Sequence, residues 1–440
     1  MTIHEVQKPQ SLRPFLALWT GQAISLFGSQ LVQFAIIWWL TEQTGSASIL
    51  AVASIVGLVP QVLLGPFVGV LVDRWNRRRI LLISDAAVAS VSLLLAFMYF
   101  TGMVEIWHVY LALFIRALGG AFHWPAMTAS TSLMVPQDQL TRMQGLNQIL
   151  NGGLNIVSAP IGALMVAALP MYQVLLIDVL TAVVAIGAVF VIRIPQPRKR
   201  ETHESAQSSL RAYWSDMRAG LRYMVNWRGL MMLAGLAMFV NLVLAPANSF
   251  MPLLVTEHFH GQAWHLGVLE SAFGVGVVLG GLLLGIWGGF KNRIVTSMMG
   301  LTGIGLGILI VGLTPVSLFP LAIFGMWLSG VMGSLTDGPI FAIFQSKVDP
   351  AMQGRVFSLV GSMVQVMTPL GLAVSGPIAD LVGIRLWIIL GGAFTTVVGI
   401  STFFIPTLMN LENERDDFVE VGQAVPTNMS AALETTGNAR

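Results

Sequence analysis

Three ionisable residues inside long apolar stretches are the first candidates for chemistry. Arg116, Asp178 and Glu270 each interrupt a stretch that is otherwise almost free of charge, and an ionisable group in such surroundings is costly enough to mark a functional candidate. An arginine stays charged and needs a carboxylate partner, whereas an acid without such a partner tends to hold a proton. Such an acid can bind and release a proton reversibly.

The apolar stretches around these residues predict helices that span a lipid bilayer. The chain has 440 residues, of which 55% are hydrophobic and only 10% charged. A bilayer core about 30 Å thick requires roughly 20 apolar residues per helix. We therefore expect an all-α integral membrane protein with twelve transmembrane helices, at residues 14–41, 46–72, 80–101, 107–134, 144–169, 171–193, 229–255, 263–287, 294–313, 316–344, 355–380 and 384–408.

The positions of lysine and arginine predict the orientation of these helices. All but two of the 23 lysine and arginine residues fall on one side of a twelve-helix arrangement; the exceptions are Arg116, inside a helix, and Arg385, on the other side. Because positively charged loops stay in the cytoplasm, we expect both termini to be cytoplasmic and the protein to lie in the cell (inner or plasma) membrane. The net charge of +2 reflects this loop bias, so we expect no nucleic-acid partner.

The chain repeats itself once. Both "VPQDQLTR" (residues 135–142) and "VDPAMQGR" (348–355) end a stretch on the basic side, and three further pairs follow at nearly the same separation. Two parallel halves predict a cavity at their interface, near the middle of the bilayer. We expect two pseudo-symmetric six-helix bundles at residues 14–194 and 229–408, with a cytoplasmic N-terminus (1–13), a linker (195–228) and a disordered cytoplasmic tail (409–440).

The linker has two parts. Its first dozen residues are typical of a solvated tether. Further along, apolar residues recur at helical spacing beside a stripe of arginines. The apolar residues are Leu210, Trp214, Met217, Leu221 and Met224. This pattern predicts an amphipathic helix in the membrane interface.

The stretch "GVLVDRWNRRRI" (residues 69–80) concentrates charge in the turn between the second and third helices. It resembles the loop motif of the major facilitator superfamily, with matches at Gly69, Asp73, Arg74, Arg77 and Arg78. Asn76 stands in the place of a usual glycine, and asparagine tolerates left-handed backbone, so we expect the turn to be kept. The resemblance implies a gate of charge-assisted pairs that break when the halves move apart; the alternative is that the arginines only set the topology.

Two more motifs carry the same resemblance. "RALGGAF", from Arg116, is similar to the helix-4 arginine motif of the superfamily. "VSAPIGA" is similar to its helix-5 antiporter motif, through Ala159, Pro160 and Gly162, although Ala159 and Ala163 replace glycines. The superfamily fold consists of the two six-helix bundles that the repeat also predicts.

Longer stretches, among them "LFIRALGGAFHWPA" and "GRVFSLVGSM", resemble the macrolide-efflux branch of drug:proton antiporters. The resemblance covers about residues 13–408. It implies a proton-coupled exporter of bulky lipophilic compounds, macrolides or other drugs, that works by alternating access. One alternative is a siderophore or metabolite exporter on the same fold; another, of a different class, is a transport-inactive membrane sensor or assembly partner.

Within the predicted helices, we expect Glu270 and Asp178 to be the proton-carrying acids and Arg116 to be their partner. A static ion pair that fixes helix packing is the alternative for Arg116 and Asp178. His123 and Asp337 hold equivalent positions in the two halves and are candidates for a proton relay; the more ordinary account is a hydrogen bond from His123 to a backbone carbonyl freed by Pro125. We expect Asp85 to join the arginine cluster. Asp380 and Arg385 bracket the last outer loop, and we expect them to pair with each other or with water.

A wide apolar pocket with a few amide groups is predicted from the first and seventh helices. Its candidate residues are Gln30, Gln33, Phe34, Phe239, Asn241 and Asn248. No Gly-Lys pair occurs, so a phosphate-binding loop and direct use of ATP are excluded. We expect no enzyme activity, cofactor or metal, and a monomer whose partners are a small lipophilic molecule, protons and the lipid bilayer.

Overall fold

The computed structural model describes residues 12–136, 139–196 and 206–412. Within these ranges the surroundings of some helical residues lie outside the description. Gly69, Asp73 and Arg74 are among these residues. The predicted N-terminal segment and C-terminal tail lie almost wholly outside the described residues.

Within the described residues, twelve helices are long and apolar enough to cross a membrane. The described residues contain no β-strand, so the predicted all-α fold with twelve spans is confirmed. The first six helices are α1 (Arg13–Thr44), α2 (Ala47–Arg74), α3 (Arg77–Thr101), α4 (Ile106–Met134), α5 (Leu140–Ala168) and α6 (Met171–Val191). The other six are α8 (Arg228–Ser249), α10 (Ala263–Trp287), α11 (Arg293–Leu313), α12 (Phe319–Lys347), α13 (Pro350–Val382) and α14 (Ile384–Thr402).

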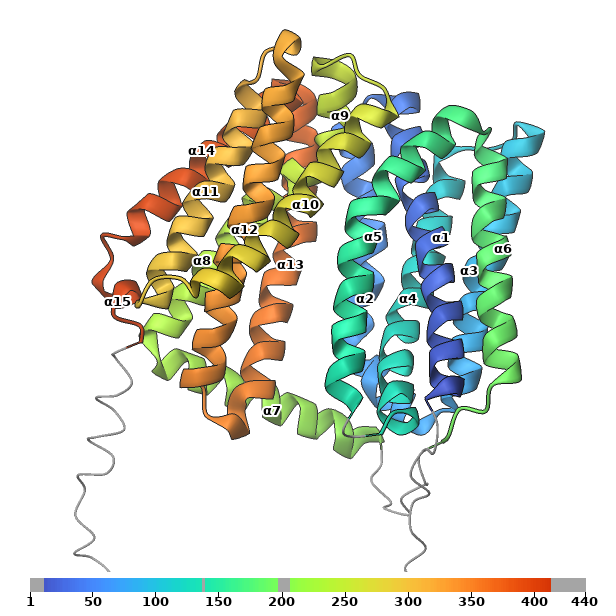
Figure 1. The fold of residues 1–440 in the computed structure, drawn as a ribbon, viewed down its shortest axis with the longest axis horizontal. Helices are drawn as coiled ribbons and strands as arrows, with labels where there is room; N and C mark the ends of the chain where they lie inside the picture. The colour runs from blue at the N-terminus through green and yellow to red at the C-terminus, as the bar shows by residue number, and fades with distance from the viewer. Residues whose placement is uncertain (1–11, 137–138, 197–205, 413–440) are drawn as a thin grey trace, which may run out of the picture.

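Shorter elements connect these helices. The helix α7 (Ala206–Asn226) joins the two sets of six and runs along one end of the molecule, between the bundles (Figure 1). Near the opposite end lie α9 (Met251–Leu253) and the π-helical turn η2 (Leu254–His258). The 3₁₀ turn η3 (Val316–Leu318) precedes α12, and α15 (Pro406–Met409) follows α14.

Two spans end earlier than hydropathy predicts. The seventh helix stops at Ser249 because Pro252 cannot donate a backbone hydrogen bond to the preceding turn. The last long helix stops at Thr402, and Ile405, which precedes Pro406, is extended with φ −101° and ψ 101°. A residue before proline is pushed out of the helical region, so the apolar residues up to 408 do not continue the helix.

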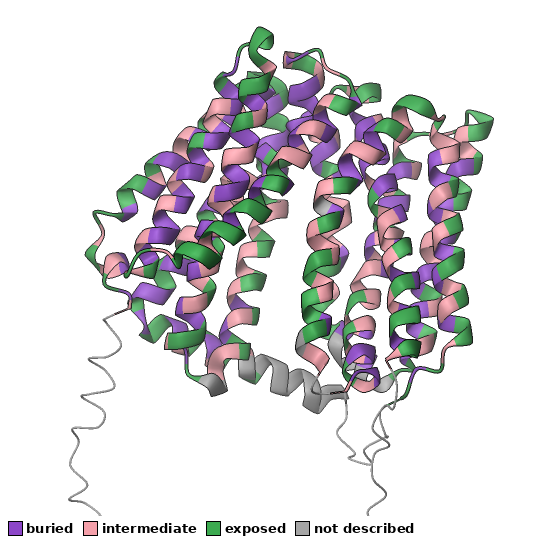
Figure 2. Ribbon diagram, in the orientation of Figure 1, coloured by how far each residue is buried: buried purple, intermediate pink, exposed green. Residues whose placement is uncertain are grey.

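Small residues allow close helix crossings inside the second bundle. A β-carbon at Gly325 of α12 would lie 2.7 Å from the carbonyl oxygen of Gly307 of α11. Such contact between backbones is the usual way in which helices associate in lipid, because burial of apolar surface contributes little to helix association there. Buried residues accordingly concentrate inside each bundle (Figure 2), whereas large apolar side chains such as Phe100, Phe190 and Ile286 are exposed, as expected for a surface covered by lipid.

The two bundles converge at one end and separate towards the other (Figure 1). We call the first the closed end; it carries α9 and the α1–α2 turn at Gly45. We call the second the basic end; it carries α7 and the α2–α3 turn at Asn76. Near the closed end α10 packs on α5, since a β-carbon at Gly267 would lie 3.1 Å from Cα of Pro160.

Candidate functional site

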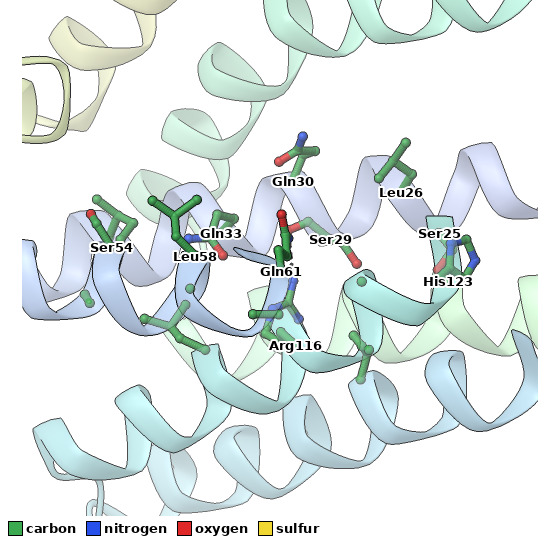
Figure 3. Close-up of a pocket in the computed structure, with 18 of the residues that line it drawn as sticks. Ser25, Leu26, Ser29, Gln30, Gln33, Ser54, Leu58, Gln61, Arg116 and His123 are labelled. Atoms are coloured by element: carbon green, nitrogen blue, oxygen red, sulfur yellow. Dashed lines mark hydrogen bonds between the residues drawn. The ribbon is translucent and has the colours of Figure 1, made fainter. Parts of the chain in front are cut away.

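A cavity of about 610 Å³ is lined mainly by α1, α2, α3 and α4, with α8, α9 and α10 contributing from the second half. Polar side chains from α1, α2 and α4 line it (Figure 3). It brings together six residues predicted from the sequence, which are Gln30, Gln33, Arg116, His123, Asn248 and Glu270. A smaller cavity of about 190 Å³ adjoins Gln30, Gln33, Phe34 and Glu270.

One face of α1 supplies much of the polar wall. Gln22, Ser25, Ser29 and Gln33 recur three to four residues apart and therefore share a side of the helix. Gln22, Ser25 and Ser29 were not among the predicted site residues, because they are uncharged and the predictions within the spans rested on ionisable groups. The signal was present as a polar stripe at helical spacing in an otherwise apolar helix.

Arg116 and Asp178 form a buried ion pair, in which Nη1 of Arg116 donates to Asp178. Asp178 also accepts hydrogen bonds from the hydroxyls of Ser29, at 2.8 Å, and Ser92, at 2.7 Å. Arg116 further donates to the Ser29 carbonyl, at 3.0 Å, and to the Ser92 hydroxyl, at 2.9 Å. The side chain of Asp178 is 0% exposed and does not line the described cavities. This complete network favours a static role for the pair.

Glu270 has the opposite environment. It is half-buried, lines both cavities, and its carboxyl makes no hydrogen bond or ion pair with any residue of the described ranges. Beside it in the smaller cavity, the hydroxyl of Ser158 is buried and also lacks a described partner. A membrane carboxyl without an arginine partner is the group expected to exchange a proton.

A second polar cluster lies on the cavity wall. Nε2 of Gln22 donates to Asp85 at 2.9 Å, and Nε2 of His123 lies 2.8 Å from Oε1 of Gln22 and 3.4 Å from Oδ1 of Asp85. Asp85 thus joins Gln22 and His123 instead of the expected arginine cluster, because α3 turns it towards α1 and α4. The predicted partner of His123, Asp337, is exposed on α12 and forms no ion pair with it in the described structure.

The arginines of the loop motif bind backbone carbonyls of the first half. Nη1 of Arg77 donates to the Ala129 carbonyl at 2.7 Å, and Arg78 donates to the Val189 carbonyl at 3.0 Å and to that of Phe190. The side chains of Asp73 and Arg74 lie outside the described part. The turn is kept, but the backbone of Asn76 is not left-handed, since its φ is −69°. Asn76 is instead the N-cap of α3, and its side chain accepts a hydrogen bond from the Arg79 amide at 3.2 Å. Asparagine is a favoured residue at this position.

The helix-5 motif lies where the two halves touch. A β-carbon at Gly267 of α10 would meet Pro160 and Ala163 at 3.1 Å and the Ala159 carbonyl at 3.2 Å. On the other side of α5, a β-carbon at Gly162 would lie 3.0 Å from the ring of Phe34. The motif therefore brings α5 close to both α10 and α1.

Asp380 of α13 closes the same end by binding the first turn of α2 in the other half. It accepts hydrogen bonds from the Ala47 amide at 2.6 Å, the Ser48 amide at 3.1 Å and the Ser46 hydroxyl at 3.1 Å. The expected pair with Arg385 is wrong, since Arg385 donates to the carbonyls of residues 312 and 313 at the end of α11. Helix amino ends attract carboxylates and carboxyl ends attract guanidinium groups.

The remaining pocket candidates separate into two groups. Gln30, Gln33, Phe34 and Asn248 line the two cavities, whereas Phe239 and Asn241 do not. The ring of Phe239 packs edge-on against Phe394 at 5.1 Å. The side chain of Asn241 accepts a hydrogen bond from Thr368 at 2.6 Å.

Twelve helices in two bundles around a cavity, with ionisable groups on its wall, are the architecture of a secondary transporter. The family model of the Major Facilitator Superfamily matches residues 18–372, and the chain belongs to this superfamily of multi-pass membrane transporters. It is 35% identical to Macrolide efflux protein A of Streptococcus pyogenes over 90% of this chain and 97% of that protein. The predicted resemblance to the macrolide-efflux branch is thereby confirmed.

Other relatives agree with this assignment. The chain is 34% identical to Macrolide efflux protein A of Enterococcus faecalis, over 74% of this chain and 100% of the relative. It is 27% identical to Multidrug efflux pump Tap of Mycobacterium bovis, over 88% and 91%. Among solved structures, a bacterial homologue of the iron transporter ferroportin aligns with a TM-score of 0.67 at 14% identity, over 89% of this chain and 99% of that one. The nucleoside transporter NupG aligns with a TM-score of 0.58 at 13% identity, over 87% and 97%. Family and fold are thus those of transporters.

Proposed function

We propose that the protein is a proton-coupled secondary exporter of bulky lipophilic compounds, with macrolides as the first substrate class and other drugs as further ones. The names of its relatives, macrolide efflux and multidrug efflux proteins, support the substrate class. The observation that carries the mechanism is the carboxyl of Glu270, which lines the cavity and has no described partner. Alternating access is supported by the contact of the two halves at the closed end and their separation towards the basic end in the described residues (Figure 1).

The orientation of the transporter supports this direction. We place the basic end in the cytoplasm, because lysine and arginine concentrate there. The conformation that is closed by Asp380 and by the contact between α5 and α10 then faces inward. A lipophilic compound reaches the cavity from the cytoplasm or the inner leaflet, and the amides of Gln30, Gln33 and Asn248 bind its polar groups.

Protons supply the energy in this proposal. One proton that enters down a potential of 100 mV supplies about 2.3 kcal/mol, and each unit of pH difference adds about 1.4 kcal/mol. Glu270 takes up its proton when the closed end opens and releases it to the cytoplasm when the basic end opens. The pair of Arg116 and Asp178 holds α1, α3, α4 and α6 together throughout.

The loop motif at residues 69–80 is the inner gate in this proposal. Arg77 and Arg78 are anchored on the first half, and Asp73 and Arg74 lie at the end of α2, next to the entrance. In the outward-facing state we expect the loop to bind the second half through charge-assisted pairs. In this proposal, the separation of the halves at the basic end breaks these pairs.

Inverted membrane vesicles with an acidic lumen test this proposal. The proton gradient is followed by a fluorescent dye while erythromycin, a lipophilic cationic dye or a catecholate siderophore is added. Proton release from the lumen on adding erythromycin, lost in Glu270→Gln and kept in Glu42→Gln, is the expected result. Glu42 is an exposed glutamate at the end of α1 and serves as the matched control.

The outcomes distinguish the alternatives. A response to the siderophore alone would replace the substrate class and keep the coupling. A response to erythromycin that Glu270→Gln leaves intact would contradict the role of Glu270. Silence with every compound would favour a transport-inactive sensor or assembly partner.

A further inference from the structure

We propose that His123, together with Asp85, forms a second proton-binding site on the cavity wall, and that the proton binds at Nδ1 of His123. The inference rests on the proposed function only for its role in transport. Proton binding itself can be measured without transport. The site lies on α3 and α4 of the first half and is separate from Glu270 of α10.

The hydrogen bonds of Gln22 define which ring nitrogen carries the proton. Nε2 of Gln22 donates to Asp85, so the oxygen of the same amide is left to face Nε2 of His123 at 2.8 Å. An amide oxygen can only accept, so Nε2 of His123 carries a hydrogen and donates it. Nδ1 of the neutral ring is then an acceptor, and within the described residues it makes no hydrogen bond.

Exposure makes this acceptor reachable. The side chain of His123 is 25% exposed and that of Asp85 is 8% exposed, and both line the 610 Å³ cavity. A proton from the cavity that binds Nδ1 converts the ring to imidazolium. Its Nε2–H already faces Asp85 at 3.4 Å, so the new positive charge meets a negative charge that is in place.

The contrast with Asp178 indicates that Asp85 is not merely a second structural acid. Asp178 is neutralised by an arginine that cannot release its proton, and it is fully buried. Asp85 has an amide and a histidine as partners, and the histidine is the side chain whose charge changes near neutral pH. With neutral histidine the pair carries one negative charge in the membrane, and with imidazolium it is neutral.

Other charged groups around the pair act at longer range. On α3, Arg77 lies two turns nearer the basic end and is bound to α4. On α4, Arg116 lies two turns nearer the closed end and is paired with Asp178 of α6. Glu270 of α10 lines the same cavity. From α1, the contact with the pair is made by the uncharged Gln22. The charged side chains at the end of α2 lie outside the description. Asp85 is thus the one described acid in direct range of His123.

The position of the pair gives it a role distinct from that of Glu270. Glu270 is in the second turn of α10, counted from the closed end, whereas Asp85 is in the third turn of α3, counted from the basic end. A proton released by Glu270 into the cavity can be held by His123 before it leaves at the basic end. A positively charged ring there also repels a cationic compound, so proton binding and cation binding oppose each other.

Nitrogen-15 NMR of the full-length protein in nanodiscs, labelled at its seven histidines, tests the proposal. His123→Gln assigns the signal of His123 by its loss. We expect that signal to report an Nε2–H tautomer at high pH and protonation at Nδ1 as the pH falls from about 9 to about 5. Asp85→Asn should lower the midpoint by about one pH unit, a tenfold loss of proton affinity, whereas Asp337→Asn, the matched control in the second half, should leave it unchanged.

Failure of this inference is distinguishable from failure of the proposed function. A ring that stays neutral over the whole range, in the wild type alone, would overturn the inference even if Asp85→Asn did not fold. An equal midpoint in Asp85→Asn would overturn the role of Asp85. If either result were found while vesicles still coupled erythromycin to protons, the proposed function would stand and this inference would fail. If His123 bound a proton in a protein that did not transport, this inference would stand and the proposed function would fail.

Discussion

Two membrane carboxylates of this transporter, Asp178 and Glu270, differ in what surrounds them, and our proposal gives them different roles for this reason. Asp178 has an arginine and two serine hydroxyls as partners and is fully buried. Glu270 has no described partner and faces two cavities. A paired acid stabilises the bundle, whereas an unpaired acid at a cavity is free to change its protonation.

Stability measurements on two isosteric variants should separate these roles. Asp178→Asn leaves the guanidinium of Arg116 buried without a counter-charge, a change that costs about 3 to 5 kcal/mol. We expect a clear loss of thermal stability in detergent or nanodiscs. Glu270→Gln breaks no described contact and should change the unfolding temperature little. Equal losses in both variants would show that Glu270 also has a structural partner.

At the scale of the element, the closed end depends on α13 capping α2 across the two halves. Asp380→Asn removes a charge-assisted cap, worth about 1 to 2 kcal/mol. This energy shifts the equilibrium between closed and open ends roughly five- to thirtyfold. The chain has no cysteine, so Ser48→Cys supplies a single thiol at the contact. We expect an impermeant maleimide to label it faster from outside the cell in Asp380→Asn than with native Asp380.

Glu42→Gln provides the control for this experiment. Glu42 is an exposed acid near the same end of the molecule, so its loss changes the local charge without removing the cap. Faster labelling in both variants would indicate a general charge effect, and unchanged labelling in Asp380→Asn would show that the cap does not hold the halves together.

The connection between α9 and α10 adds a pH dependence to the closed end. Partial burial and the nearby carboxylate of Asp380 raise the pKa of Glu257 above its ordinary value. The closed state therefore binds this proton more tightly than a state in which Glu257 is fully solvated. Below the ordinary carboxyl pKa, Glu257 is protonated in both states and costs nothing; as the pH rises through the raised pKa, its ionised form destabilises closure.

Glu257→Gln should remove this penalty. We expect slower labelling of the same Ser48→Cys thiol at neutral pH, by a few-fold because Glu257 is largely exposed, and no difference from the parent near pH 4. Slower labelling at both pH values, or faster labelling at neutral pH, would contradict this account of Glu257.

At the scale of the whole molecule, the two halves contribute unequally. The first half supplies most of the cavity wall and both polar clusters. In the second half, Phe239 and Asn241 are engaged within their own bundle. Transport requires the halves to exchange one set of contacts at the closed end for another at the basic end. We therefore expect the first half to supply most of the polar contacts of the cavity, whereas the coupling acid of our proposal, Glu270, comes from the second half.

The sequence predicted the helices far better than their contacts. Bilayer thickness fixes the length of an apolar span, so the sequence predicts all twelve, and the largest errors lie where Pro252 and Pro406 end helices that hydropathy extends. Glu270 and Arg116 were found because charge in lipid is rare. Gln22 was missed because it is uncharged, and the partner of Asp380 was missed because Ala47 lies more than three hundred residues away in the chain. No pattern in one sequence reports such a pairing.

Proton release on ligand binding is the most direct test of the central claim that a cavity acid exchanges its proton for a substrate. Purified protein in weakly buffered detergent solution near neutral pH would be mixed with erythromycin, and the released protons counted with a pH dye. The account predicts proton release by the wild type, and its loss in Glu270→Gln while binding of the ligand persists. Binding without proton release in the wild type, or equal release in Glu270→Gln, would contradict it.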